Sequence, residues 1–472
     1  MTGQAEIVVV GAGPAGLNAA LAAAQAGARV TVIDGYARPG GQYYRQPPER
    51  SGFEPTHRQR RGYELWQQAL HAGAKLLPDT LVWNISSDKT IDCRGPQGAF
   101  QIKPLAVILA TGPFERAVAF PGWTLPGVLM TGAAQVLLYQ HVLPGRRVRL
   151  AGTGPLQLVV AGKILAAGGG VAGVLEGSRL LPQALSQLGG AWGHWEKLWE
   201  AAASLLNLLS HAVPFRRGWG LLAAAGTRQV EGATIARLDT NWRPIAGTER
   251  QVICDTICIE YGMAPFNALA RLAGAAHEWR PDLGGEAPLR DATFQTSIAG
   301  IYAAGDGAGV GGAPLAMLEG RIAGISAAAG LGYDQASAAD KIRRLVPALK
   351  REQAFQRMYA ALFMPGEGIF ELAREDTILC RCEGVTLGML RSAAAAGARY
   401  ITNLKSATRA GMGECQGRVC GYQMAALLAK ATGQTVPEVG LYRPRPPIFP
   451  IPIGELAQGQ NLDSLNTVKI NA

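Results

Sequence analysis

Four of the seven cysteines in this 472-residue chain lie close together near its C-terminal end: Cys380, Cys382, Cys415 and Cys420. Their pattern is Cys-x-Cys, a spacer of 32 residues, and Cys-x4-Cys. Four thiols without a histidine are typical of a zinc site or an iron–sulfur cluster. Because the chain shows no secretory signal, this clustering indicates metal binding and not disulfides.

The residues around these cysteines favour an iron–sulfur cluster over zinc. Zinc ribbons usually carry two Cys-x2-Cys knuckles, and this chain has none. The loops contain glycines whose N–H groups could bond to cluster sulfurs, and arginines that would offset thiolate charge, at positions 411, 413, 417, 421 and 381, 409, 418 respectively. The sequence predicts a [2Fe–2S] cluster with four Cys ligands, and zinc or free thiols are the alternatives.

A second chemical signal lies at the N-terminus, where residues 6–34 read as strand, glycine turn, helix and strand. The turn consists of Gly11, Ala12, Gly13, Pro14, Ala15 and Gly16. Gly11 permits the tight turn, Gly13 lets a pyrophosphate approach the helix N-terminus, and Gly16 lets the helix pack against the strand. Asp34 would accept hydrogen bonds from an adenosine ribose. This fingerprint predicts a bound dinucleotide, and a purely structural turn is the alternative.

Three further segments could approach the same ligand. Gly41 and Gln42 lie in a loop that follows Asp34. A predicted strand at residues 105–109 ends in Ala110, Thr111 and Gly112, and another, which begins near residue 296, ends in Gly305 and Asp306. Because small residues at strand ends bring backbone close to a cofactor, we expect these segments to converge on one extended molecule.

A second glycine turn follows a predicted strand at residues 147–150. It contains Gly152 and Gly154, with Gln157 in the third glycine position and Glu176 as the acid. An acid favours the free ribose of NAD over that of NADP. An adenine nucleotide, NAD or ATP, is one interpretation of this unit. A structural Rossmann unit without a ligand is the other, because Gln157 departs from the pattern and an apolar insertion rich in Trp and Leu follows.

The remaining cysteines and the histidines show no catalytic arrangement. Cys254 and Cys258 lie four residues apart on a predicted strand, which would separate them by about 13 Å, too far for a disulfide. We interpret both, and Cys93, as structural. The six histidines are scattered singly, so no general base or nucleophile pair is predicted and no catalytic residue is assigned.

Composition limits the partners that the chain could have. The formal net charge is +10, but no basic stripe is interleaved with aromatic residues, so nucleic acid is not expected. An acidic protein partner or a solvated surface fits the charge better. The most apolar stretch, residues 156–175, contains Lys163 and three consecutive glycines, so no membrane span is predicted. We expect a cytoplasmic protein.

The strand-end segments together resemble the flavoproteins with two dinucleotide-binding domains, such as the disulfide reductases. This resemblance implies an α/β fold with two Rossmann-like domains and a bound FAD, contacted by Gly11, Gly13, Gly16, Asp34, Gln42, Thr111 and Asp306. The four-cysteine module resembles the small α-helical [2Fe–2S] domain of bacterioferritin-associated ferredoxin. The expected domains are FAD-binding at 1–145 and 251–335, NAD-like at 146–250, a helical connector at 336–372, the [2Fe–2S] domain at 373–435 and a Pro-rich tail at 436–472.

Over nearly the whole chain, the arrangement resembles the α subunits of opine oxidases, D-hydroxyproline and L-proline dehydrogenases, and hydrogen cyanide synthase. The matching motifs are Gly40-Gly41-Gln42, Glu260-Tyr261-Gly262, Gly305-Asp306-Gly307, Cys415-Gln416-Gly417-Arg418 and the Pro-rich segment 443–450. The Gly-Gly-Gln loop favours the opine and imino-acid branch over cyanide synthase.

In this family a separate β subunit with its own flavin oxidises the amine. The resemblance therefore implies that this chain passes electrons through FAD and the cluster to an external acceptor. A small γ subunit, an FMN at a subunit interface, and peripheral membrane association through the acceptor chain stay open. The alternatives are a cyanide synthase subunit, a self-contained NADH-dependent reductase and a zinc-binding scaffold without catalytic function.

Overall fold

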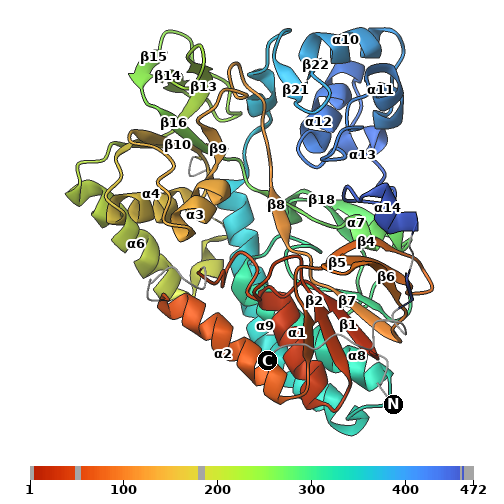
Figure 1. Cartoon of the computed structure of the whole chain (residues 1–472). Coiled ribbons are helices and arrows are strands. Elements are labelled where there is room, and N and C mark those ends of the chain that lie inside the picture. The colour runs from red at the N-terminus through yellow and green to blue at the C-terminus, as the bar shows by residue number, and fades with distance from the viewer. Residues whose placement is uncertain (1–4, 48–54, 179–185, 458–459, 462–472) are drawn as a thin grey trace. The chain divides into compact units, whose positions relative to one another are not determined.

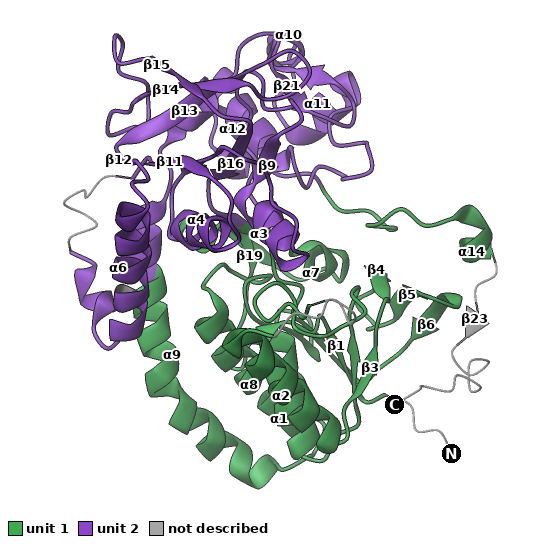
Figure 2. Ribbon diagram, turned by 60° about the vertical axis from the view of Figure 1, so that its left-hand side comes forward, with its two compact units in different colours: residues 1–114, 264–356, 443–472 green, residues 115–263, 357–442 purple. Residues whose placement is uncertain are grey.

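The structure is a computed structural model that describes residues 5–47, 55–178, 186–457 and 460–461 (Figure 1). The chain divides into two compact units, shown in different colours in Figure 2. Unit 1 comprises residues 1–114, 264–356 and 443–472, and unit 2 comprises residues 115–263 and 357–442. These limits differ from the predicted domain limits, because strand β9 at Val128–Met130 pairs within the sheet of unit 2. The role expected for each domain stays a prediction.

Unit 1 is built on a parallel sheet in the order β20-β7-β1-β2-β3. The predicted strands at 6–10 and 105–109 are its central strands β1 and β7. The five strands are β1 (Ile7–Val10), β2 (Val30–Ile33), β3 (Lys75–Leu77), β7 (Ala106–Leu109) and β20 (Ile301–Ala303). Val and Ile dominate these short strands, as expected where helices cover both faces of a parallel sheet. All five strands therefore end at the same edge.

Helices α1 (Pro14–Gln25) and α8 (Ala313–Gly330) pack together unusually closely. A Cβ atom on Gly320 would lie 2.0 Å from the carbonyl oxygen of Ala15, and one on Gly324 would lie 2.3 Å from that of Ala19. Only glycine permits this approach, so the small residues of both helices are a packing requirement. The amphipathic helix expected near residues 57–73 is α2 (His57–His71).

The rest of unit 1 consists of smaller sheets and helices. The sequence correctly predicted an antiparallel arrangement in the region of β4 and β5. The further elements are β4 (Leu81–Ile85), β5 (Ile91–Gly95), β6 (Gly98–Ile102), β23 (Gln460–Asn461), α7 (Ala268–Leu272), β18 (His277–Arg280), β19 (Gly285–Pro288) and α14 (Ile453–Ala457). The long helix α9 (Gln335–Phe363) contributes residues to both units.

Unit 2 contains a second parallel sheet, in the order β12-β11-β10-β16-β9. Its strands besides β9 are β10 (Val148–Gly152), β11 (Val171–Glu176), β12 (Phe215–Arg217) and β16 (Thr256–Glu260). The helices of this sheet region are α3 (Thr131–Tyr139), α4 (Leu156–Ala166) and α6 (Trp195–Ser210). An antiparallel sheet, β13 (Trp219–Ala225), β14 (Gly232–Arg237) and β15 (Arg250–Ile253), completes this region.

The C-terminal part of unit 2 is a small, mostly helical module that contains the four clustered cysteines. Its core consists of buried residues such as Leu379, Leu390, Leu404, Met424 and Leu428. The elements are β21 (Ile378–Cys380), β22 (Val385–Thr386), α10 (Leu387–Ala395), α11 (Ile401–Thr408), α12 (Gly421–Thr432) and α13 (Val436–Val439). The helices expected near 386–397 and 400–408 are α10 and α11.

One local prediction is wrong. Cys254 does not share a strand with Cys258, because β15 ends at Ile253 and β16 begins at Thr256. Cys254 therefore lies in the short turn between two strands, and the 13 Å separation expected along one strand does not apply. Both thiols are free and buried, as is that of Cys93.

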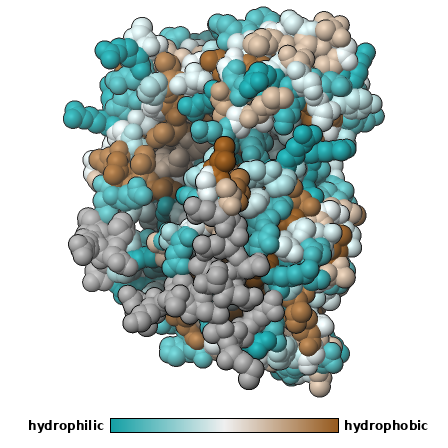
Figure 3. Space-filling view, turned by 45° about the vertical axis from the view of Figure 1, so that its right-hand side comes forward, coloured by the Kyte–Doolittle hydropathy of each residue, from teal (hydrophilic) through white to brown (hydrophobic). Residues whose placement is uncertain are grey.

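The surface shows no continuous apolar band on the face drawn in Figure 3, where hydrophilic residues predominate and hydrophobic residues form separate patches. No helix within the described ranges is both long enough and apolar enough to cross a membrane. Residues 462–472 of the predicted Pro-rich tail lie outside the described part of the chain.

Candidate cofactor-binding sites

The three segments expected to converge in unit 1 meet at the carboxyl edge of its sheet. A Cβ atom on Gly11 would lie 2.3 Å from the Ala110 carbonyl oxygen, and one on Gly307 would lie 2.6 Å from Thr111 Oγ1. The loop after β2 joins them, since the N–H of Gly40 donates to the carbonyl of Ala12 at 2.8 Å. Residues 11–41, 110–112 and 305–307 therefore form one surface around the start of α1.

Space is left where a pyrophosphate would approach this surface. A Cβ atom on Gly13 would meet only the Cα of Gly41, at 3.9 Å, and one on Gly112 would meet nothing within 4 Å. Gly13 is the N-cap residue of α1, and the N-terminus of a helix favours an anion. Backbone that is glycine-lined and open at a helix N-terminus fits the pyrophosphate of FAD.

Asp34 lies at the end of β2, and its carboxylate holds the turn together. Its side chain is only 6% exposed, and its two oxygens accept from the N–H groups of Ala12 at 2.5 Å and Tyr36 at 2.8 Å. Burial raises the pKa of Asp34, although both N–H donors act in the opposite direction. Each carboxylate oxygen can accept more than one hydrogen bond, so the expected ribose contact is compatible with this geometry.

The other predicted contacts are placed less uniformly. Asp306 lies seven residues before α8, not at its first turn, and its Oδ1 accepts from the N–H groups of Gly311 and Gly312, both at 2.9 Å. Burial raises the pKa of this carboxyl. Thr111 donates through Oγ1 to the carbonyl of Phe266 at 2.6 Å. Gln42 is exposed, and its amide donates to the Tyr36 hydroxyl at 3.0 Å.

Sequence reasoning missed a buried ion pair that supports the Gly305 turn. Glu319 of α8 is 4% exposed, and its Oε2 accepts from Arg290 Nη1 and from the N–H of Gly305, both at 2.8 Å. Arg290 Nη1 also donates to the carbonyl of Ala303 at 3.0 Å. The available signal was a single acid in the otherwise apolar first half of α8. Its partner lies 29 residues away, so no local pattern could identify it.

The second glycine turn, in unit 2, follows the same plan with a longer acid. Glu176 ends β11, and its oxygens accept from the N–H groups of Gly154 at 3.0 Å and Ser178 at 2.9 Å. Burial raises the pKa of Glu176. The corresponding acid of the first turn accepts from Ala12, the middle residue, whereas Glu176 accepts from the second glycine itself. The N–H that would face a phosphate is therefore already bonded.

The space over Gly154 is also filled. A Cβ atom on Gly154 would lie 2.9 Å from Glu260 Oε1 and 3.1 Å from the Tyr359 hydroxyl. Burial, with the neighbouring carboxylates of Glu115 and Glu176, raises the pKa of Glu260 well above its usual value. Its Oε2 is buried without a hydrogen-bond partner. These side chains occupy the place that remains open over Gly13 in the first turn.

The four clustered thiols contact one another in the C-terminal module. Cys420 lies within hydrogen-bonding reach of Cys380 and Cys415, and Cys382 within reach of Cys415. The Cys420 thiol and the N–H groups of Gly411 and Glu383 lower the pKa of Cys380 to about 6. The Cys420 thiol and the N–H groups of Val419 and Gly417 lower the pKa of Cys415 to about 5. The donor chemistry suits a soft metal, and backbone N–H groups surround the sulfurs.

The arrangement of these thiols is nevertheless not that of a finished metal site. Across the described residues, no group of three or more His, Cys, Asp or Glu side chains has the geometry to hold a metal ion. The thiols contact one another in pairs along a row and do not enclose one point. The predicted ligands are therefore brought together, but the cluster itself stays a prediction.

Family models match both parts of the chain. The pyridine nucleotide-disulphide oxidoreductase model matches residues 5–332, and the sarcosine oxidase A3 domain matches residues 376–460. Hydrogen cyanide synthase subunit HcnB of Pseudomonas aeruginosa is 35% identical over 461 residues, which cover 94% of this chain and 97% of the relative. The chain belongs to this family. An opine oxidase subunit of Agrobacterium tumefaciens, also a member, is 32% identical over 96% of this chain and 91% of its own length.

Solved structures show the same fold. L-proline dehydrogenase from P. horikoshii aligns with 96% of this chain and 79% of its own, with a TM-score of 0.69 and 20% identity. Thioredoxin reductase from T. acidophilum aligns with 68% of this chain and 97% of its own, with a TM-score of 0.50 and 19% identity. The fold of the family is therefore the predicted α/β disulfide-reductase type, followed by an A3 domain where the ferredoxin-like domain was expected.

Glu115 should make the stability of the chain depend on pH. Burial raises its pKa from 4.5 to about 7, although the N–H groups of Gly132 and Ala133 act against this. The folded state therefore binds more protons than the unfolded state between these values, and stability falls as pH rises from about 4.5 through 7. We expect Glu115→Gln to remove up to about 3 kcal/mol of this loss, measured as a urea midpoint that changes less between pH 5 and 8. The exposed Glu231→Gln should leave the pH dependence unchanged, and a wild-type midpoint that is constant over this range would refute the effect.

The closed second turn predicts weak binding of NADH. Since Glu260 and Tyr359 fill the space over Gly154, the pyrophosphate has neither room nor a free Gly154 N–H there. We expect Glu260→Ala, which opens this space, to bind NADH at least about tenfold more tightly than the wild type, a difference of about 1.4 kcal/mol. Calorimetric titration of both proteins measures it. Equal affinities would show that Glu260 does not close the site.

Proposed function

We propose that this chain is the electron-transfer subunit of a heteromeric, flavin-dependent dehydrogenase that oxidises an amine or imino acid. The observation that carries the proposal is the relationship over at least 94% of the chain to proteins named as subunits of opine oxidase and hydrogen cyanide synthase. A protein named as one subunit implies a partner. The partner proposed here is a β subunit that carries the amine-oxidising site.

The carboxyl edge of the first sheet is the proposed FAD site. The start of α1 at Gly13 would receive the pyrophosphate, Asp34 the ribose, and the loop that contains Asp306 the ribitol side. A bound flavin supplies two-electron oxidation and reduction. The chain itself orders the glycine turns, keeps Asp34 buried, and positions Gly305 through the Arg290–Glu319 pair.

The four cysteines of the C-terminal module are the proposed ligands of a [2Fe–2S] cluster. Support comes from their mutual contacts and from the N–H groups that surround them. The ring of Tyr442 packs against Gly411, Gly417 and Gly421, where Cβ atoms would lie 2.8, 2.3 and 3.3 Å from its carbons. These glycines let the loop wrap tightly around an aromatic anchor beside the thiols.

The substrate class rests on less specific evidence. The Gly40-Gly41-Gln42 loop favours opines or imino acids. The cyanide synthase relative is 35% identical and the opine oxidase relative 32%, so identity does not separate these two branches. Cyanide synthase therefore stays the principal alternative. A self-contained NADH-dependent reductase is less well supported, because the space over Gly154 is closed.

The proposal is tested first by the activity of the chain alone. Purified without a partner and loaded with flavin, it should not reduce an artificial dye when given opines, proline or hydroxyproline. Addition of the β subunit encoded beside it should start turnover. Steady turnover by the isolated chain would overturn its assignment to a heteromeric complex and favour a self-contained enzyme.

Asp34→Ala should weaken FAD binding. The variant loses the carboxylate that would bond to ribose and that also holds the Ala12 N–H, so we expect a loss of about 1.5–3 kcal/mol, measured by flavin retention during dilution. Asp34→Asn keeps an acceptor for Ala12 and should be intermediate. The exposed Asp340→Ala should behave as wild type, and full flavin retention by Asp34→Ala would disprove the assignment.

Cys415→Ser should lose iron and keep FAD. Serine is a harder and poorer ligand for iron than a thiolate, while the proposed FAD site contains no residue of the cysteine module. The measurement is iron, zinc and acid-labile sulfide in anaerobically purified protein. Cys258→Ala, which removes a buried core thiol, should retain iron. Stoichiometric zinc without sulfide in the wild type would end the electron-transfer account of this module.

A further inference from the structure

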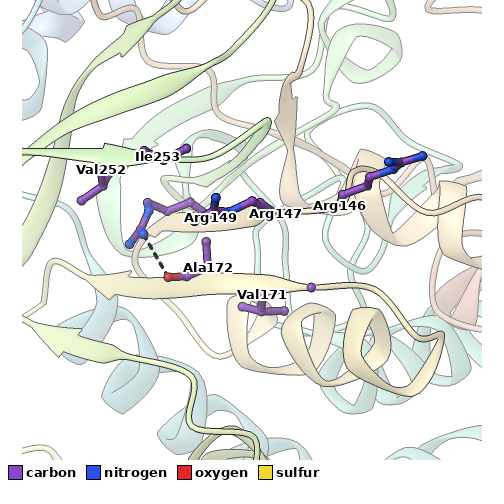
Figure 4. A pocket seen from close by; sticks show the side chains of 8 residues that line it. Arg146, Arg147, Arg149, Val171, Ala172, Val252 and Ile253 are labelled. Atoms are coloured by element: carbon purple, nitrogen blue, oxygen red, sulfur yellow. Dashed lines mark hydrogen bonds between the residues drawn. The ribbon is translucent and has the colours of Figure 1, made fainter.

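A cavity with a volume of about 390 Å³ lies in unit 2, at the edge where β10 and β11 begin (Figure 4). Its walls include Arg146, Arg147, Arg149, Val171, Ala172 and Val252. The second glycine turn follows the opposite ends of these parallel strands, so the cavity is distinct from it. The volume is within the range of small-molecule sites.

Arg149 is the unusual residue of this cavity. It is only 7% exposed, and its Nη2 donates to the carbonyl of Ala172 at 2.9 Å, while its Nε is buried without a hydrogen-bond partner. Its cross-strand neighbour is Gly173, where a Cβ atom would lie 2.8 Å from Arg149 Nη1. The glycine therefore makes room for a guanidinium on this face of the sheet. A buried cation with a donor left over is costly unless something accepts from it.

No carboxylate neutralises these arginines within the described part of unit 2. Asp255 is the nearest acid, and its oxygens accept from the backbone N–H groups of Arg146 and Arg147 at 3.0–3.1 Å. The Cys254 thiol lies within hydrogen-bonding reach of the Arg149 guanidinium. Burial raises the pKa of this thiol, so it stays neutral and does not balance the charge of Arg149.

A second guanidinium adds to the positive charge of this region. Arg216 lies near enough to Arg149 to disfavour its charged form, and it stands over the ring of Trp219 at 5.1 Å. Figure 4 shows Arg149 turned back toward Ala172 and Arg146 pointing away from it. The cavity thus has a basic wall and an apolar wall.

We infer that this cavity binds a small molecule that carries an oxyanion, either phosphate or carboxylate. Arg149 is the buried anchor, because its Nε is a donor without an acceptor, and Arg147 is the exposed cation at the rim. Val171 and Val252 contact the apolar part of the ligand. Arginine suits this task because its planar fork of donors matches both kinds of oxyanion. The site is independent of the proposed electron-transfer function and its cofactors.

Titration of the full-length, flavin-loaded chain at constant ionic strength tests the site. The probes are inorganic phosphate, phenyl phosphate and benzoate, and binding is measured by calorimetry and by the shift in melting temperature. We expect saturable binding, with phenyl phosphate tighter than inorganic phosphate because its ring contacts the valines. Phenyl phosphate and benzoate share the ring and differ in the anion, so the tighter of the two identifies the preferred oxyanion.

Arg149→Met should weaken binding of the preferred probe at least tenfold, while Arg228→Met, an exposed arginine outside the cavity, should leave it unchanged. Arg147→Met should weaken it about threefold and serves as the deciding variant if Arg149→Met does not fold. Equal affinities of wild type and the arginine variants would overturn the inference. The absence of saturable binding of all three probes to the wild type would overturn it as well.

Discussion

The cofactor edge of unit 1 depends on one constraint, which is that backbone segments approach more closely than any Cβ atom would allow. A Cβ atom on Gly16 would lie 1.8 Å from the carbonyl oxygen of Gly11, and one on Gly11 would lie 2.3 Å from that of Ala110. The same is true of Gly320 on α8, at 2.0 Å from the Ala15 carbonyl. These approaches bring β1, α1, β7 and α8 together, and the open space over Gly13 exists because they do.

The two glycine turns show how one methylene group can change what a turn is able to bind. Asp34 reaches the middle residue of its turn, Ala12, whereas the longer Glu176 reaches Gly154. The second turn therefore bonds its own phosphate-facing N–H internally. Glu260 and Tyr359 then fill the space that is open over Gly13. The fold repeats a dinucleotide-binding unit, but the repeat has the geometry of a structural element.

Local patterns in the sequence predicted the parts of the fold that depend on neighbouring residues. The strand, turn and helix around Gly11–Gly16, the helix α2 and the short helices around the cysteines follow from apolar periodicity and glycine placement. The convergence of residues 110–112 and 305–307 on the first turn followed from the rule that parallel strands end at one edge. The contacts that support this edge could not be predicted in the same way. Arg290 and Glu319 are far apart in sequence, and Cys254 looked like a strand residue because two strands flank its turn.

Three buried charges in this chain are compensated in three different ways. Glu319 is paired with Arg290 and also accepts from the N–H of Gly305, so its charge is balanced inside the protein. Glu260 has two acidic neighbours and a strongly raised pKa, which means that it avoids the cost of burial by remaining protonated. Arg149 can use neither route, because no carboxylate pairs with it in the described residues and a guanidinium does not lose its proton. Of the three groups, only Arg149 is left with a charge that an external anion would balance.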